Sequence, residues 1–229
     1  MFVLRIELAY FCTVSQSISS DKLFMRFGTQ MKKRPRGRPR KFNPETALTN
    51  AISVFLTKGF SGASLDDLAG AMEMNRPSLY RAFGDKEALY REALKQFVGQ
   101  MRGMMDQLVV AETDLKTAIQ NLYNASLDVY FAETPAQSCL LFCTAPVEAL
   151  VHPEVREDMN IAIGELDAVL EAKFKHAQDD GQLADHFDPA AMAKMAQGIL
   201  HSLAIRARAG APKSTLREMS SHAVSFMCT

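Results

Sequence analysis

Residues 44–93 carry a dense series of helix start and stop signals, and this series limits the fold more than any other feature. Pro44 is suited to the first turn of a helix, and apolar residues follow it at helical spacing. Gly59 stands where a left-handed cap would end that helix. Ser64, with Asp67 three residues later, has the pattern of a capping box. We therefore expect a second helix directly after the first.

Two more helices are expected after that pair. Asn75 and Pro77 begin a very short one, which Gly84 ends, and Asp85 caps a longer one. No alternation of apolar and polar residues is long enough to predict a sheet, so the chain is predicted to be all-α. The single proline within the fifteen-residue segment 136–150 predicts a kink. Further helices are expected at residues 94–110, a segment that could continue the helix capped by Asp85, and at 114–132, 136–150, 154–179, 189–209 and 213–227.

The second and third helices, residues 64–72 and 76–82, are joined by about three residues. This is helix-turn-helix spacing, in which the second helix of the motif is free to lie in the DNA major groove. Leu79 and either Ala82 or Phe83 can face the bundle. The side chains left mostly outside hydrogen-bond phosphates and base edges, and they are Asn75, Arg76, Ser78, Tyr80 and Arg81. An ordinary amphipathic surface helix is the alternative interpretation.

Lys86 supplies a second indication. It lies in the first turn of the fourth helix, where the helix dipole disfavours a cation by some tenths of a kcal/mol, and a bound anion would reverse that penalty. Helix N-termini bind phosphate, so Lys86 and the Ser64 end of the second helix are candidate contacts to the DNA backbone. The flanking Asp85 and Glu87 could instead neutralise the lysine locally.

The charge of the chain is unevenly distributed. The total is zero, yet residues 32–41 carry +7, residues 42–93 carry −2 and residues 94–229 carry −6. The basic run KKRPRGRPRK is similar to an AT-hook, in which an extended Arg-Gly-Arg lies along a narrow minor groove. Its candidate DNA contacts are Arg36, Arg38 and Arg40. A merely polybasic tail remains open, as does a non-specific architectural DNA-binding protein, which the run alone would also fit.

Residues 45–92 resemble the DNA-binding domain of the tetracycline-repressor (TetR) family of bacterial transcriptional regulators. The matching features are a Phe-x-x-x-Gly-Phe at the end of the first helix, Ser64 at the start of the second, a Leu-Tyr-x-x-Phe in the third and a Lys-Glu-x-Leu in the fourth. Pro77 departs from the smaller residue that is commoner there. The resemblance implies that phosphate is met by Ser64, Tyr80 and Lys86, and that bases or the nearby backbone are approached by Asn75, Arg76 and Ser78.

The same resemblance implies a division of the chain. Residues 44–93 would be the helix-turn-helix DNA-binding domain, preceded by a basic arm at 32–43, and residues 94–229 would be a larger helical ligand-binding and dimerisation domain. Two copies would pair through the last two helices, where Gly198, Ser202 and Ala204 permit close approach, and would bind a roughly palindromic operator. A small apolar or amphipathic inducer would occupy a pocket with candidate lining residues Phe97, Met101, Met105, Tyr123, Tyr130 and Phe142.

Other features set the remaining expectations. Residues 1–31 are expected to be a disordered or mis-assigned extension, with translation starting at Met31. No apolar run predicts a membrane span, and no catalytic, cofactor or metal-binding motif is found, so we expect a protein that is not an enzyme. The four cysteines show no paired framework, which favours a reducing cytoplasm, and the resemblance implies a bacterial regulator associated with the nucleoid. Cys139 and Cys143 are four residues apart and would share a helix face. A thiol-based redox sensor acting through them is the alternative to an organic ligand.

Overall fold

The computed structural model describes residues 43–132 and 139–228, and in these ranges every regular element is a helix, as predicted. The predicted basic arm and the extension before it lie outside the described residues, apart from Asn43. The α-helices are α2 (Pro44–Gly62), α3 (Leu65–Ala71), α4 (Arg76–Phe83), α5 (Lys86–Met105), α6 (Leu115–Tyr130), α7 (Ala145–Glu148), α8 (Pro153–Asp179), α9 (Pro189–Arg208) and α10 (Lys213–Met227). Two π-helical turns, η1 (Asp106–Val110) and η2 (Leu140–Thr144), complete the set.

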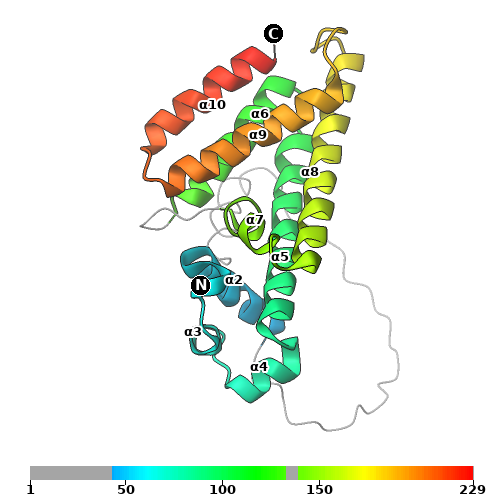
Figure 1. Ribbon diagram of the computed structural model, residues 1–229. Coiled ribbons are helices and arrows are strands. Elements are labelled where there is room, and N and C mark those ends of the chain that lie inside the picture. Colours follow the sequence, from blue (N-terminus) through cyan, green and yellow to red (C-terminus); the bar gives the residue numbers. More distant parts are fainter. Residues whose placement is uncertain (1–42, 133–138, 229) are drawn as a thin grey trace, which may run out of the picture.

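The short helices α3 and α4 form one end of the molecule together with α2 and the beginning of α5 (Figure 1). From there α5 runs beside α8 toward the other end, where α6, α9 and α10 pack together. The segment formed by η2 and α7 lies between the two ends and contacts α2, α5, α8 and α9. Because η2 touches elements of both ends, a displacement of this segment can reach the helix-turn-helix elements.

Local signals explain how α2 begins and where it bends. Asn43 caps its first turn by accepting a hydrogen bond from the Glu45 amide at 3.0 Å. Gly59 has φ +70° and ψ 178°, and residues that carry a Cβ rarely adopt such a positive φ. The predicted break at Gly59 is confirmed, and one further short turn carries Phe60 back toward the bundle.

The prediction of a single helix at residues 136–150 is wrong. Residues 133–138 lie outside the described part, and the helical backbone after Cys139 consists of η2 followed by the single turn of α7. The amide of Ala145 donates to the carbonyl of Leu140, five residues back, immediately before Pro146. Proline has no N–H and its ring crowds the carbonyl four residues earlier, so the backbone widens at this point. The proline therefore ends the π-helical turn and starts α7, where a kink was expected.

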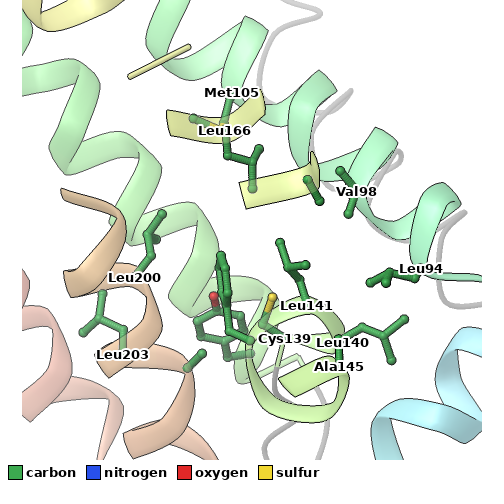
Figure 2. Close-up of a cluster of buried hydrophobic side chains, with 14 of the residues drawn as sticks. Leu94, Val98, Met105, Cys139, Leu140, Leu141, Ala145, Leu166, Leu200 and Leu203 are labelled. Carbon is green, nitrogen blue, oxygen red and sulfur yellow. The ribbon is translucent and has the colours of Figure 1, made fainter. Parts of the chain in front are cut away.

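The segment 94–110 is continuous with the helix that Asp85 caps, and only its last five residues differ, forming η1. Leu94, Val98 and Met105 of α5 point into a buried cluster with Cys139 and Leu140 (Figure 2). Leu200 and Leu203 of α9 belong to the same cluster (Figure 2), and the hydrophobic core also includes Phe55, Leu68 and Leu79 of the helix-turn-helix end. One continuous hydrophobic core thus joins the helix-turn-helix elements to the remainder of the chain.

Candidate DNA-binding surface

A reciprocal cap closes the N-terminus of α3. The amide of Asp67 donates to Ser64 Oγ at 3.1 Å, and the Ser64 amide donates to the Asp67 carboxylate at 3.0 Å. The Ser64 hydroxyl also donates to this carboxylate, and Lys58 Nζ of α2 lies 2.6 Å from its other oxygen. Lys58 and then Ser64 lower the pKa of Asp67 to about 2. The predicted capping box is confirmed, and the hydroxyl hydrogen of Ser64 is already used within the protein.

A bidentate ion pair joins the first turns of α3 and α4. Arg76 Nε lies 2.7 Å from one oxygen of Asp66, and Arg76 Nη2 lies 2.5 Å from the other. The hydrogen bond from Arg76 lowers the pKa of Asp66. Arg76 therefore braces α3 against α4, and it can reach a base only by leaving Asp66. Since Asp67 pairs with Lys58, both acids at the start of α3 have a cationic partner and repel a phosphate less.

The exposed face of α4 is set by its cap and its single buried anchor. Asn75 Oδ1 accepts from the Ser78 amide at 2.9 Å, which leaves the side-chain NH₂ of Asn75 for other partners. Pro77 lies in the first turn, where its missing N–H removes no helical hydrogen bond. Leu79 is fully buried, Ser78 is half-buried, and the Tyr80 side chain is 48 % exposed. Leu79 thus fixes the helix while Asn75 and Tyr80 face outward.

Ala82 and Phe83 were the two candidates for a second inward-facing position on α4. Ala82 is exposed, whereas Phe83 is half-buried and packs against the hydrophobic core. Arg81 is exposed in the last turn, where a cation is favoured by the helix dipole.

Lys86 is the first residue of α5, and it forms no ion pair with either neighbouring carboxylate. Asp85 caps the helix by accepting from the Ala88 amide at 2.8 Å. Glu87 lies 2.9 Å from the imidazole nitrogen Nδ1 of His152, the N-cap residue of α8. The Lys86 ammonium sits 4.5 Å from the ring centroid of Phe60, in a cation–π contact. The alternative interpretation, in which Asp85 or Glu87 pairs with Lys86, is therefore not what the side-chain contacts show.

Several residues that position this surface were not predicted as site residues. Phe60 supports Lys86, and the Gly-Phe at the end of the first helix was the signal that could have indicated it. Asn50 Nδ2 of α2 donates to the carbonyl of Ala71 at 2.9 Å and so holds the end of α3. No short motif marks Asn50, because its partner lies 21 residues away. Arg36, Arg38 and Arg40 lie outside the described residues.

The comparisons with known proteins agree with this arrangement. Residues 47–93 match the model of the family described as bacterial regulatory proteins, tetR family. The chain is 24 % identical over 192 residues to the HTH-type transcriptional repressor ComR of Escherichia coli K12, covering 83 % of this chain and 91 % of ComR. It also superposes on the TetR family regulator CifR, solved with a 26-bp operator DNA, with 29 % identity and a TM-score of 0.73 over 82 % of this chain and 98 % of CifR.

The DNA-binding end of this chain, residues 47–93, belongs to the tetR family. The chain is a DNA-binding transcriptional regulator. The E. coli regulator NemR in its reduced form has the same fold, with a TM-score of 0.73 at 18 % identity over 81 % of this chain and 96 % of NemR.

In this tetR-family protein, the six residues predicted to line an inducer pocket lie within or against the core of the C-terminal region. Met105, Tyr123, Tyr130 and Phe142 are buried, and Phe97 and Met101 are half-buried. Two depressions in the described surface lie elsewhere. One is lined by Asn50, Ser53, Val54, Thr57, Lys58 and Ala71, and the other by Pro153, Arg156, Glu157, Asn160 and Ile161.

Polar groups are interspersed among these core residues. The Tyr123 hydroxyl donates to the carbonyl of Ala196 in α9 at 3.0 Å. The ring of Phe142 lies 3.7 Å, centroid to centroid, from that of His201, and His201 Nε2 lies 3.2 Å from the side-chain oxygen of the buried Gln197. Burial lowers the pKa of His201. The region therefore offers aromatic surface and hydrogen-bonding groups, closely packed.

The two cysteines of the expected thiol pair have different environments. Cys139 is buried, and this burial raises the pKa of its thiol to about 12. Its sulfur lies 3.9 Å from the sulfur of Met101. Cys143 is half-buried. Because the thiolate is the reactive species, Cys139 is a poor nucleophile at neutral pH.

No helix within residues 43–132 and 139–228 is both long and apolar enough to cross a membrane. No group of three or more histidine, cysteine or acidic side chains in those ranges is placed to hold a metal ion.

Proposed function

We propose that the protein is a dimeric transcriptional repressor that binds a roughly palindromic operator and is released by a small apolar or amphipathic inducer. In this proposal residues 44–93 form the DNA-binding domain, and residues 94–229 form the domain that binds the inducer and pairs the subunits. The observation that carries the proposal is the outward face of α4, with Asn75 and Tyr80, beside Lys86 at the start of α5, which is ion-paired with neither flanking carboxylate.

Each predicted contact has a chemical role in this proposal. The Asn75 amide and, once it leaves Asp66, the Arg76 guanidinium suit base edges or the nearby backbone. Tyr80 and Lys86 suit phosphate, and Ser64 and Ser78 lie at the helix starts where backbone amides face an anion. The named repressor function of ComR and the operator bound to CifR support this assignment.

The affinity of the purified protein for its own upstream DNA, compared with unrelated DNA of equal length, tests the proposal. Fluorescence anisotropy at moderate salt should give tighter binding to the upstream fragment, by a factor of roughly 10³ or more. Equal affinities, measured with folded protein, would count against operator recognition and favour a non-specific architectural protein.

Dimerisation is proposed through α9 and α10. Met195, Gly198, Ser202 and Ile205 recur at helical spacing on the face of α9 opposite its buried residues, and Met195 and Ile205 are 47 % and 55 % exposed. An apolar stripe with a central glycine permits two helices to approach closely. Ala204 cannot contribute, because it is fully buried in its own subunit.

Inducer binding is proposed among the aromatic and methionine residues of the C-terminal region. These side chains are closely packed, so an inducer must displace some of them, and methionine adapts readily to such displacement. Release requires only that the inducer bind the DNA-incompetent spacing more tightly than the competent one. A thermal-shift screen with hydrophobic compounds, followed by operator binding in the presence of each stabilising compound, tests this step.

The thiol-based alternative now depends on Cys143, because the raised pKa of Cys139 disfavours its oxidation. The similar regulator CifR was solved as a cysteine-substituted variant, and this observation supports the thiol-based alternative. An oxidant response of operator binding that is unchanged in Cys143→Ser would remove it.

Two further aspects follow from the proposal. A regulator of this kind needs no catalytic activity, and its relatives are named as regulators. Its expected location is the bacterial cytoplasm, on the chromosome that carries the operator.

A further inference from the structure

His152 contacts the DNA-binding end of the molecule from the corner between α7 and α8. Its Nδ1 lies 2.9 Å from Glu87 Oε2 in the first turn of α5. At this distance the imidazole and the carboxylate form an ion pair when the ring is protonated. The His152 ring also meets the ring of Phe60 at 5.1 Å and 68°, in an edge-to-face arrangement. A single side chain of the C-terminal region therefore contacts both α2 and α5.

Phe60 is shared by His152 and Lys86. The Lys86 ammonium lies 4.5 Å from the centroid of this ring, and Tyr90 packs against it at 5.3 Å. The Tyr90 hydroxyl is in turn 2.7 Å from Thr144 Oγ1 in η2. Phe60 therefore positions Lys86. Phe60 itself contacts His152 directly, and it contacts η2 indirectly through Tyr90.

The same histidine also determines where the charge of Glu87 lies. Glu87 and Lys86 are adjacent in the first turn of α5 and point to different sides of the helix, so the Glu87 carboxylate acts on the Lys86 site through the distance between the two charges. A carboxylate nearer the ammonium would weaken its attraction for phosphate. His152 holds Glu87 on the α8 side. Glu148 of α7 lies 4.0 Å from the other imidazole nitrogen and is buried, so the ring stands between two carboxylates.

We propose that His152 is a positioning residue for DNA binding, which holds Glu87 away from Lys86 and so keeps the Lys86 ammonium available to a DNA phosphate. This inference rests on the proposed phosphate contact of Lys86. His152 is the N-cap residue of α8, and its amide donates to the Glu148 carbonyl at 2.8 Å. Movement of the α7–α8 corner therefore releases Glu87, which connects a change in the C-terminal region to the strength of one phosphate contact.

The dependence of operator affinity on salt tests the proposal, because each lost phosphate contact lowers the slope of log K against log[salt] by about 0.9. Lys86→Gln sets the reference loss. His152→Ala is expected to lose up to the same amount in slope. When His152→Ala is combined with Glu87→Gln, the slope is expected to stay at its wild-type value, since the Glu87 carboxylate that His152 held away from Lys86 is then absent. A purely structural effect of His152 would not be cancelled in this way.

Two conservative variants keep the test valid if His152→Ala does not fold. The amide nitrogen of asparagine can take the place of Nδ1, so His152→Asn should retain the wild-type slope. Glutamine places its amide nitrogen nearer Nε2, so His152→Gln should lose part of the slope. Far-UV circular dichroism and thermal unfolding establish that each variant is folded.

Two outcomes overturn the proposal, and they are distinguishable. If Lys86→Gln lowers the slope but no His152 variant does, the positioning role is wrong while the DNA-binding surface stands. If Lys86→Gln leaves the slope unchanged, the phosphate contact of Lys86 is itself wrong, and the role of His152 falls with it.

Discussion

The guanidinium of Arg208, in the last turn of α9, donates a hydrogen bond from Nη1 to the backbone carbonyl of Leu56 in α2 at 3.0 Å. Leu56 lies in the last turn before the break at Gly59, where carbonyls lack full helical partners and a cation is favoured. The helix proposed to pair two subunits is therefore tied directly to the first helix of the DNA-binding end.

Arg208→Ala should lower the free energy of unfolding by about 1 kcal/mol, because a hydrogen bond from a charged donor to a helix end is lost. For a chain of this size that corresponds to a fall in Tm of about 2–4 °C. Arg206→Ala is the matched control, since Arg206 bonds to Ser202 within its own helix. Equal Tm values for the two variants would show that the link to Leu56 adds no stability.

Asp66→Asn should raise affinity for unrelated DNA and lower the preference for the operator. One negative charge leaves the surface, and the brace between α3 and α4 is lost with it. Asp85→Asn removes a charge nearby but keeps a competent N-cap, so it should raise both affinities together. Competition binding with the two DNAs measures the ratio. A ratio unchanged by Asp66→Asn would argue that Arg76 does not orient α4.

Asp67 should make stability depend on pH in the acid range. Its pKa in the folded protein is about 2, below the ordinary value of 3.8. The unfolded chain therefore binds the proton more readily, and this contribution is present above pH 3.8 and disappears as the pH falls toward 2. Urea unfolding of wild-type protein and Asp67→Asn should give a stability difference that narrows over this range. A constant difference would contradict the proposed pairing with Lys58 and Ser64.

Cys139 should resist thiol reagents in the folded protein, because burial keeps it protonated at neutral pH. Peptide mapping after brief treatment with a maleimide should find Cys143 modified well before Cys139. In urea the two should react alike. Fast modification of Cys139 in the folded state would restore it as a candidate sensor.

Gly198→Leu should dissociate the proposed dimer without unfolding the subunit. A Cβ at Gly198 meets no atom of its own chain within 4 Å, and leucine has the higher helix propensity. Gly164→Leu, in α8, is the control, because its Cβ position is equally open. Light scattering should report monomers for the first variant and dimers for the second. Dimers in both would place the subunit interface elsewhere.

The helix-turn-helix elements could be predicted because their boundaries are set by local chemistry. The caps at Ser64, Asn75 and Asp85 and the break at Gly59 each depend on residues within a few positions, and all four are confirmed. The buried position of Leu79 followed from helical spacing.

The contacts that tune this surface could not be predicted from spacing. His152 and Glu87 are 65 positions apart, and Arg208 and Leu56 are 152 apart, so only the packed fold brings them together. The π-helical turn before α7 was also missed, since the proline predicted a disturbance of the helix but not its form. Nor did helical spacing distinguish pocket-lining from core methionines and aromatic residues.

The central claim is that α4 and the start of α5 form the DNA-binding surface. Its most direct test is the operator affinity of Tyr80→Ala/Lys86→Gln compared with Lys175→Gln/Lys194→Gln, whose exposed lysines lie in α8 and α9. The first pair should weaken binding at least about tenfold, consistent with about 1 kcal/mol or more for each lost contact. The second pair should bind as the wild type does. Equal affinities for the two double variants, both folded, would contradict the claim.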